Sequence, residues 1–499
     1  MKKFQLNFIT NKTIVRWFKI LYEFEKNNEG TAAILAMICK STRRTIGTDI
    51  QEIRDFFGNT ILLETTQQGY TFKQLNFKEY TKKKAVLLSN EPLFVLVERL
   101  FQGEVHSIEE WAEIFHLSPT TTQKYFQKMQ HQLDHFGLKL SFRPVMIQGN
   151  EMDIRSFYFS FFYESEVTPH TIFPTVAVQQ AVNEIGQLFN KDNYHFSSFT
   201  LTSYLLLISI ERYLSGNRVS IHKDLFLAVQ SSVQLMHFQK INYIMENYFN
   251  FVFPEEEVLY LFISIVTQRT MRNTVVEQKF CLSYNHWPEI GFLTKEFFKH
   301  FFPLQYNKNY KPDLILLESF FTTAKLKACL NFSANKNIED INDFVQKTFS
   351  DEYSSYLEFL YNNKHYLKLY SLDYLPDFCA NLVIYLEYVR ERYWGTSKNI
   401  AFIFEGNRSI CQFIENLAKK YLHPFQSLFF PDSGEVNAKY LEKNKIDILV
   451  TNYSEYIADF DNCTECILFR SIPTASDWNK LLAKVNPKIT YQYKLSDRF

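Results

Sequence analysis

The sequence of 499 residues lacks the short motifs that mark the commonest enzyme active sites. It contains no GxxxxGKS or GxxxxGKT loop, no complete GxGxxG, no GxSxG elbow and no HExxH pair. These absences argue against the usual nucleotide-binding, hydrolase and zinc-protease sites. We therefore predict that the chain is not an enzyme, and we assign it no catalytic residue and no cofactor.

Long apolar runs are also absent, since polar residues interrupt the N-terminal MKKFQLNFITNKTIVRW and no segment reaches the length of a bilayer span. The seven cysteines are scattered, unlike an extracellular disulfide framework. Only Cys463 and Cys466 form a CxxC pair, and nothing nearby completes a zinc site, so no metal is predicted. These features predict a soluble cytoplasmic protein without a membrane partner.

Net charge is the third missing feature, because 54 Lys and Arg residues balance 54 Asp and Glu residues. The whole chain therefore has no overall attraction to a polyanion. Residues 1–90 differ, with 15 basic against 8 acidic residues. This basic segment ends in the run Lys82, Lys83 and Lys84, which is more typical of a solvated linker than of a phosphate site and is not assigned as one.

The most informative positive feature is the segment 107–137, which predicts two helices joined by a tight turn. Ser107 can cap the first helix in a capping box with Glu110, and Ser118 with Pro119 can begin the second. Apolar residues at helical spacing predict a buried stripe on each helix. These residues are Ile108, Trp111, Ala112 and Phe115, and then Phe126, Met129, Leu133 and Phe136.

The other face of the second helix is polar or cationic and can bond base edges or phosphates in the major groove. The candidates for DNA contact are Thr120, Thr121, Gln123, Lys124, Gln127 and Lys128. The next stretch, LKLSFRPVMIQGN, alternates apolar and polar residues around Arg143 and Pro144. This alternation predicts a β-hairpin, which would be the wing of a winged helix.

A weaker copy of the pattern lies between Thr31 and Lys73, with a helix around AAILAMICK, a turn near residues 41–42, a second helix and a wing at TILLETTQQGYTFK. The second helix is expected to bury Ile46, Ile50, Ile53 and Phe57 and to direct Arg43, Arg44, Thr45 and Thr48 toward the groove. Gly47 weakens that helix by roughly 1 kcal/mol relative to alanine. Paired helices also occur in proteins that never bind DNA, but two winged copies favour a DNA-binding function.

Residues from about 170 to 395 are poor in glycine and follow long helical patterns. The stretch NFVFPEEEVLYLFISIV near residue 250 resembles DYLPDFCANLVIYLEYV near residue 373, and each follows another amphipathic helix. We predict two tandem helical bundles of about 110 residues each. The many aromatic residues at these spacings indicate core packing.

From Lys398 onward, short apolar strands alternate with amphipathic helices, which predicts a small α/β domain with a largely parallel sheet. NIAFIF, QSLFF, KIDILVTNY and ECILFR are the expected strands. Helices are expected at SICQFIENLAKKYL, VNAKYLEKNK and SDWNKLLAKV, with none between the last two strands. The first strand runs into residues 405–408, a place where phosphate-binding loops occur in such folds. One glycine there is a weak signal.

This order of domains resembles the Mga and AtxA type of virulence regulators of Gram-positive bacteria over nearly the whole chain. The resemblance implies winged-helix domains at 1–75 and 76–165, helical domains like the PTS regulation domains (PRDs) of the sugar phosphotransferase system at 166–280 and 281–395, and a domain like its IIB component at 396–499. It also implies binding to double-stranded promoter DNA, activation of transcription, a homodimer and contact with PTS phosphotransfer proteins.

The chain departs from this pattern at the expected phosphorylation sites. Leu205, two turns before Arg212, and Ser264 stand where PTS regulation domains usually carry histidine. His170, His195, His222 and His365 stay open as acceptors, and no phosphorylated residue is assigned. IIB enzymes carry a reactive cysteine after their first strand, where this chain has Glu405 and Gly406; its nearest cysteine, Cys411, is expected within the following helix.

Two other functions compete with DNA binding. The chain could be a phosphotransferase-linked carrier, which the missing loop cysteine disfavours. It could also be a helical scaffold that binds protein partners, in which case the N-terminal helix pairs would only pack against neighbouring helices.

Overall fold

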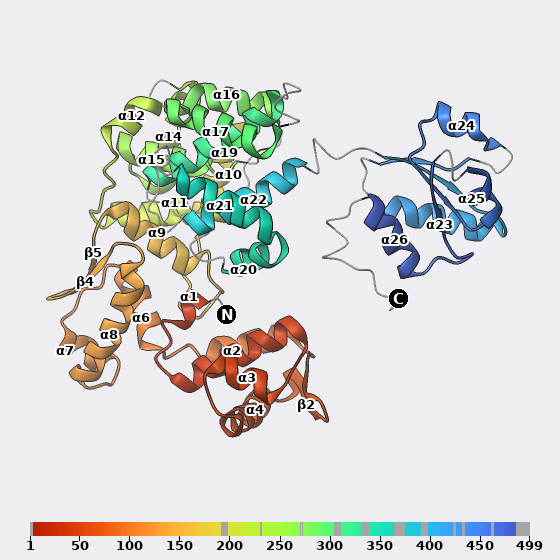
Figure 1. Ribbon diagram of the computed structural model, residues 1–499. Helices are drawn as coiled ribbons and strands as arrows, with labels where there is room; N and C mark the ends of the chain where they lie inside the picture. The colour runs from red at the N-terminus through yellow and green to blue at the C-terminus, as the bar shows by residue number, and fades with distance from the viewer. Residues whose placement is uncertain are drawn as a thin grey trace. The chain divides into compact units, whose positions relative to one another are not determined.

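The computed structural model describes residues 3–190, 198–229, 232–269, 271, 273–303, 311–330, 339–363, 375–390, 398–422, 426–431, 435–460 and 464–485. The chain divides into two compact units, 1–384 and 385–499 (Figure 1). Helices predominate in the first unit, which confirms the expected mainly helical, multidomain fold with helix-turn-helix pairs at the N-terminus. Within the described residues, every helix is too short or too polar to cross a bilayer.

The first winged helix has its own core, built where the sequence predicts it. Its elements are α2 (Lys12–Asn27), β1 (Glu29–Gly30), α3 (Ala32–Cys39), α4 (Arg43–Phe57), β2 (Ile61–Thr66) and β3 (Gly69–Gln74), followed by α5 (Phe77–Val86). The three strands pair antiparallel in the order β1-β3-β2. Thr42 caps α4 by accepting from the backbone N–H of Thr45. The predicted apolar stripe of α4 is buried, from Ile46 to Phe57.

The second winged helix repeats the arrangement (Figure 1). It consists of α6 (Pro92–Phe101), α7 (Ile108–Ile114), α8 (Pro119–Asp134) and the hairpin of β4 (Lys139–Phe142) and β5 (Val145–Gln148), followed by α9 (Glu151–Phe162). The capping box of Ser107 and Glu110 is present, and Ser118 caps α8 with Pro119 in the first turn. These local predictions are confirmed, because caps and apolar spacing are fixed by neighbours in sequence.

The N-terminal segment packs mainly with the second winged helix, in a core that also includes Phe18 of α2. Helix α1 (Lys3–Leu6) is followed by Phe8 and Ile9, and both are fully buried in the core that holds α6, α8 and α9. The side chain of Gln5 bonds the backbone of Glu166 in both directions, at 2.8 and 3.1 Å. The two winged helices are therefore interlocked through a segment that precedes both.

The helical middle continues the first unit. Its helices are α10 (Val176–Asn190), α11 (Phe199–Leu214), α12 (Lys223–Val229), α13 (Val233–Phe238), α14 (Ile241–Phe249), α15 (Glu255–Val266), α16 (Thr274–Tyr284), α17 (Pro288–Phe301), α19 (Lys311–Cys329), α20 (Glu339–Thr348), α21 (Ser350–Asn362) and α22 (Leu375–Val389). Helices α11 and α15 are central, since nearly every residue of α15 is buried. The similar stretches near 250 and 373 both form helices, α15 and α22.

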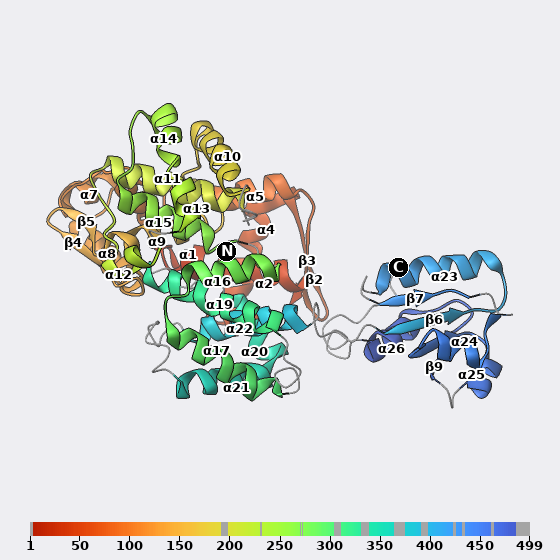
Figure 2. The ribbon, with the colours of Figure 1, turned by 90° about the horizontal axis from the view of Figure 1, so that it is seen from above.

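The second unit contains an α/β domain with a four-stranded parallel sheet in the order β7-β6-β8-β9 (Figure 2). Its elements are β6 (Asn399–Ile403), α23 (Arg408–Tyr421), β7 (Ser427–Phe429), α24 (Ala438–Lys443), β8 (Ile448–Thr451), α25 (Ser454–Phe460), β9 (Glu465–Leu468) and α26 (Ala475–Val485). Ile400 and Phe402 pack with α23 and α26, and Ala401 and Ile403 pack on the other face.

The parallel sheet predicted from the sequence is confirmed, but α25 was missed. The strands β8 and β9 were expected to follow one another without a helix between them. Parallel neighbours require a crossover connection, and α25 provides it.

Candidate DNA-binding surface

The N-terminal end of α4 presents cations to solvent. Arg43, Arg44 and Thr48 are exposed, and Thr45 is half-buried beside Thr42, with 2.9 Å between their hydroxyl oxygens. Lys40, in the preceding turn, is exposed too. Within the part of the chain that the structure describes, the side chains of Lys40, Arg43 and Arg44 have no polar partner. Their charges are therefore available to a phosphate.

Helix α4 is held in place by groups that the sequence did not reveal as positioning residues. Arg16 of α2 donates from Nε and Nη2 to the carboxylate of Asp49, at 2.7 and 2.9 Å, and the side chain of Asp49 is only 2% exposed. The hydrogen bond with Asp49 raises the pKa of Arg16 above its usual value. Arg54 donates to the backbone carbonyl of Leu63 at 2.9 Å, which ties α4 to its wing.

The lysine run at 82–84 is not a solvated linker, so that interpretation was wrong. Lys83 donates to the carbonyls of Phe56 and Phe57, at 2.9 and 3.0 Å, and so caps the end of α4. Lys84 pairs with Glu25 at 2.9 Å and is mostly buried. Lysine side chains placed at the last carbonyls of a helix stabilise its negative end.

Helix α8 presents a mostly uncharged polar face. Thr120, Gln123, Lys124 and Gln127 are exposed, and Thr121 is half-buried beside the capping Ser118. The amides of Gln123 and Gln127 and the ammonium of Lys124 have no hydrogen-bond partner among the described residues. These groups can bond to a ligand without breaking contacts within the protein.

Lys128 lies differently from the expectation that it contacts DNA. Its Nζ donates to the backbone carbonyl of Ile9 at 2.5 Å, and burial lowers the pKa of its ammonium. It therefore anchors the N-terminal segment to α8. The sequence contains no local signal for this role, because Ile9 lies 119 positions away.

The wing of the second winged helix is tied to the rest of that domain. Gln130 of α8 donates to the carbonyl of Leu138 at 3.0 Å and accepts from the backbone N–H of Leu140 at 2.7 Å. At the tip, Arg143 is exposed and precedes Pro144 through a cis peptide bond. Arg143 was not assigned as a contact from the sequence, although an arginine at a hairpin tip was visible there.

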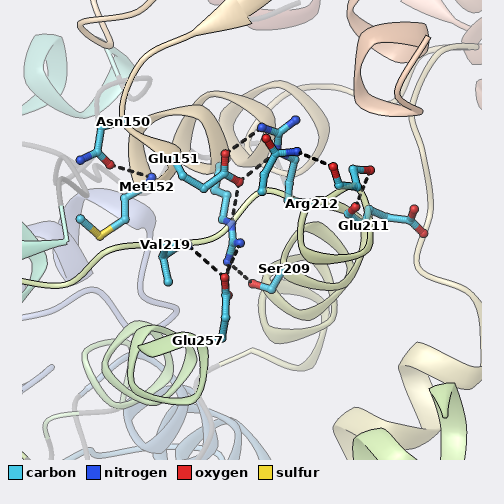
Figure 3. A network of polar contacts seen from close by, with 11 residues as sticks. Asn150, Glu151, Met152, Ser209, Glu211, Arg212, Val219 and Glu257 are labelled. Carbon is cyan, nitrogen blue, oxygen red and sulfur yellow. Dashed lines mark hydrogen bonds and ion pairs between the residues drawn. The ribbon is translucent and has the colours of Figure 1, made fainter. Parts of the chain in front are cut away.

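A buried polar network joins α9, directly after this wing, to the helical middle (Figure 3). Arg155 donates from Nη1 and Nη2 to the two carboxylate oxygens of Glu257, at 2.6 and 2.8 Å, and from Nε to Glu151 at 3.0 Å. Glu151 also accepts two hydrogen bonds from Arg212, and Glu257 accepts from the backbone N–H of Val219. Two cations and two anions alternate, so the network is electrically balanced.

Burial makes the inner pair of this network energetically important. The side chains of Arg155 and Glu257 are 1% and 0% exposed. Burial opposes the charge on Arg155, but the hydrogen bonds and charge of Glu257 outweigh it and raise the pKa of the guanidinium above its usual value. A desolvated pair of this kind holds two elements in one relative position, because separation would leave a buried charge.

The structure restricts where a phosphoryl group could be accepted. Leu205 and Ser264 are buried, and the hydroxyl of Ser264 donates to the carbonyl of Tyr260. His170 is also buried; its Nδ1 lies 2.7 Å from Glu98, and its Nε2 lies 3.1 Å from the carbonyl of Leu88. Neither nitrogen of His170 is free for phosphate.

Of the other three candidate histidines, one lies within the described residues. His222 is exposed, whereas His195 and His365 lie outside the described residues. The same holds for Cys463 of the CxxC pair.

The loop after β6 in the C-terminal domain is closed by internal contacts. Asn452 exchanges two hydrogen bonds of 2.8 Å with the backbone of Glu405, and the hydroxyl of Tyr456 donates to the Glu405 carboxylate. Cys411 lies within α23, as expected, and its thiol faces the carbonyl of Phe404. No thiol of the described residues lies in this loop.

Comparison with known proteins agrees with this geometry. A family model described as the Mga helix-turn-helix domain matches residues 71–162, from the first wing through α9. The capsule synthesis positive regulator AcpB of Bacillus anthracis is 22% identical over 491 residues, which cover 94% of this chain and 98% of AcpB. The chain therefore contains an Mga helix-turn-helix domain and is similar over most of its length to a regulator of this type.

Two further regulators match this chain over shorter stretches. The capsule synthesis positive regulator AcpA of Bacillus anthracis is 22% identical over 229 residues, 45% of this chain and 44% of AcpA. A putative trans-acting regulator of Streptococcus pneumoniae serotype 4 is 22% identical over 236 residues, 46% of this chain and 48% of that protein. The match to AcpB spans nearly the whole of both proteins, whereas the other two span about half of each.

Proposed function

We propose that this Mga-type regulator binds double-stranded promoter DNA through α4 and α8 and activates transcription from the cytoplasm. The observation that carries the proposal is the pair of capped, winged second helices whose outer faces are polar. On these faces the long side chains, Arg43, Arg44, Gln123, Lys124 and Gln127, have no polar partner among the described residues. A helix of this kind fits the major groove, while its buried stripe holds it on the domain. Activation is supported by the similarity to AcpB, a positive regulator of capsule synthesis.

The proposed contacts are those of the exposed faces. They comprise Arg43, Arg44, Thr45 and Thr48 on α4, and Thr120, Thr121, Gln123, Lys124 and Gln127 on α8. Lys128 is left out because its ammonium is bonded to Ile9. Arg143 is added as a contact from the wing, where an exposed cation can reach a phosphate or the minor groove.

The finer domain assignments are part of the proposal. The two halves of the helical middle are taken as PRD-like, supported by the similar helices α15 and α22. The parallel order β7-β6-β8-β9 supports a IIB-like C-terminal domain. Control by the phosphotransferase system and a homodimer follow from the family resemblance. The partnered Glu405 loop disfavours a phosphocarrier.

The two lysines of α8 provide a matched test. Lys124→Met should weaken binding of the full-length chain to promoter fragments and lower the slope of log affinity against log salt concentration. Lys128→Met removes one charge in the next turn but should leave the salt slope unchanged, because that ammonium does not face DNA. Gel-shift titration at several salt concentrations measures both quantities.

The outcomes separate the proposal from its rivals. Equal effects of the two substitutions would remove the exposed face of α8 from the interface. If the wild-type chain binds no duplex at any salt concentration, the protein does not act as a DNA-binding regulator, and the scaffold interpretation takes its place.

A further inference from the structure

The two winged helices carry opposite charge at equivalent places. The compared stretch runs from the N-cap of the first helix of each pair to the sixth residue after the N-cap of the second helix. In the first winged helix these are residues 31–48, which contain three cations, Lys40, Arg43 and Arg44, and no acid. The equivalent residues 107–124 contain one cation, Lys124, and three acids. Those acids, Glu109, Glu110 and Glu113, are all exposed.

This contrast has a direct electrostatic consequence. DNA phosphates attract the exposed cations of the first winged helix, and each neutralised phosphate adds salt dependence to the binding. The acids of α7 repel any phosphate that comes within about a Debye length of them, roughly 8 Å at physiological salt. The second winged helix is therefore poorly suited to supply phosphate-directed affinity, although it holds the better-capped helix pair.

The exposed face of α8 is suited to base reading instead. Gln123 and Gln127 lie one helical turn apart, about 6 Å along the axis, which approaches two base-pair steps. Both amides are exposed and have no partner among the described side chains and backbone. A glutamine amide offers a donor and an acceptor side by side, which matches the N6 and N7 atoms of adenine.

We infer that the two winged helices divide DNA recognition between them, a conclusion that rests on the proposed function. The first supplies most of the salt-dependent affinity through Lys40, Arg43 and Arg44. The second supplies sequence preference through Gln123 and Gln127, directed at adenines about two positions apart. The interlocking of the two domains through residues 4–10 presents both surfaces on one body.

The test uses the full-length chain. The wild type first selects its preferred site from a pool of random-sequence duplexes, and the salt dependence of its binding is then measured. Arg43→Ala with Arg44→Ala should lower the salt slope by about 1.8, from about 0.9 per phosphate contact, and leave the enriched sequence unchanged. Gln123→Ala with Gln127→Ala should leave the slope unchanged. It should reduce the preference for the enriched duplex over a scrambled one by about ten-fold or more.

A charge-matched control lies on α24 of the C-terminal domain, where Lys439 and Lys443 are exposed one turn apart. Replacing both lysines with alanine should change neither the salt slope nor the preference for the enriched duplex. All substitutions are at exposed positions, so thermal unfolding should show unchanged midpoints.

The inference is overturned if replacing both arginines changes the enriched sequence. It is also overturned if replacing both glutamines lowers the salt slope of binding. A wild type that enriches no site yet binds random duplexes would also overturn it. Absence of any duplex binding would instead overturn the proposed function itself.

Discussion

Replacing Glu257 by glutamine should destabilise the first unit far more than an equally short ion pair on the surface would suggest. Glutamine keeps the size of the side chain and an oxygen that can accept from the N–H of Val219. It removes the charge that compensates Arg155, whose side chain is 1% exposed. Removing one partner of a buried pair costs about 3–5 kcal/mol, because the other charge stays desolvated.

The control is the pair of Glu415 and Lys419 on α23. Its N–O distance of 2.5 Å matches the 2.6 Å of the Arg155–Glu257 pair, but its side chains are 34% and 54% exposed. Glu415→Gln should therefore cost less than about 1 kcal/mol. Comparing the two substitutions isolates burial from bond length.

Hydrogen exchange of the full-length chain in increasing urea resolves the two units separately. Peptides from α9 and α15 should lose protection at lower urea in Glu257→Gln, while peptides from α23 should not change. Adding Arg155→Met should recover part of the loss, since no uncompensated charge then remains. Equal destabilisation by Glu257→Gln and Glu415→Gln would refute the reasoning.

Three further predictions follow from individual side chains. Hydrogen bonding from the N–H of Ser107 lowers the pKa of Glu110 below its ordinary 4.5. The stability that the wild type has over Glu110→Gln should thus be constant at neutral pH and be lost as pH falls below 4.5, measured by urea unfolding. Gly47→Ala should stabilise the chain by up to about 1 kcal/mol, because the added methyl group meets no atom within 4 Å; a lower unfolding midpoint would contradict this. Incubation with phosphotransfer proteins and phosphoenolpyruvate should leave His170 unlabelled in peptide mapping, since both of its ring nitrogens are occupied; label on His170 would show that the Glu98 contact opens.

Much of the winged-helix architecture could be predicted from the sequence, because its signals are local. The caps at Ser107 and Ser118 and the apolar stripe of α8 depend on residues within a few positions of one another. Helix α25 escaped prediction because its seven residues, SEYIADF, are too few to show a clear helical period. Its presence follows from the parallel pairing of β8 and β9, which is a property of the sheet.

The sequence by itself determined where the helices, wings and α/β elements lie and which face of each is apolar, since periodicity and capping require no distant partner. Only the tertiary structure decided which polar groups are available. Lys124 and Lys128 are alike in sequence, yet one is free and the other bonds Ile9. Likewise Arg155 and Glu257 are 102 positions apart, and their mutual compensation arises only because folding removes both from water.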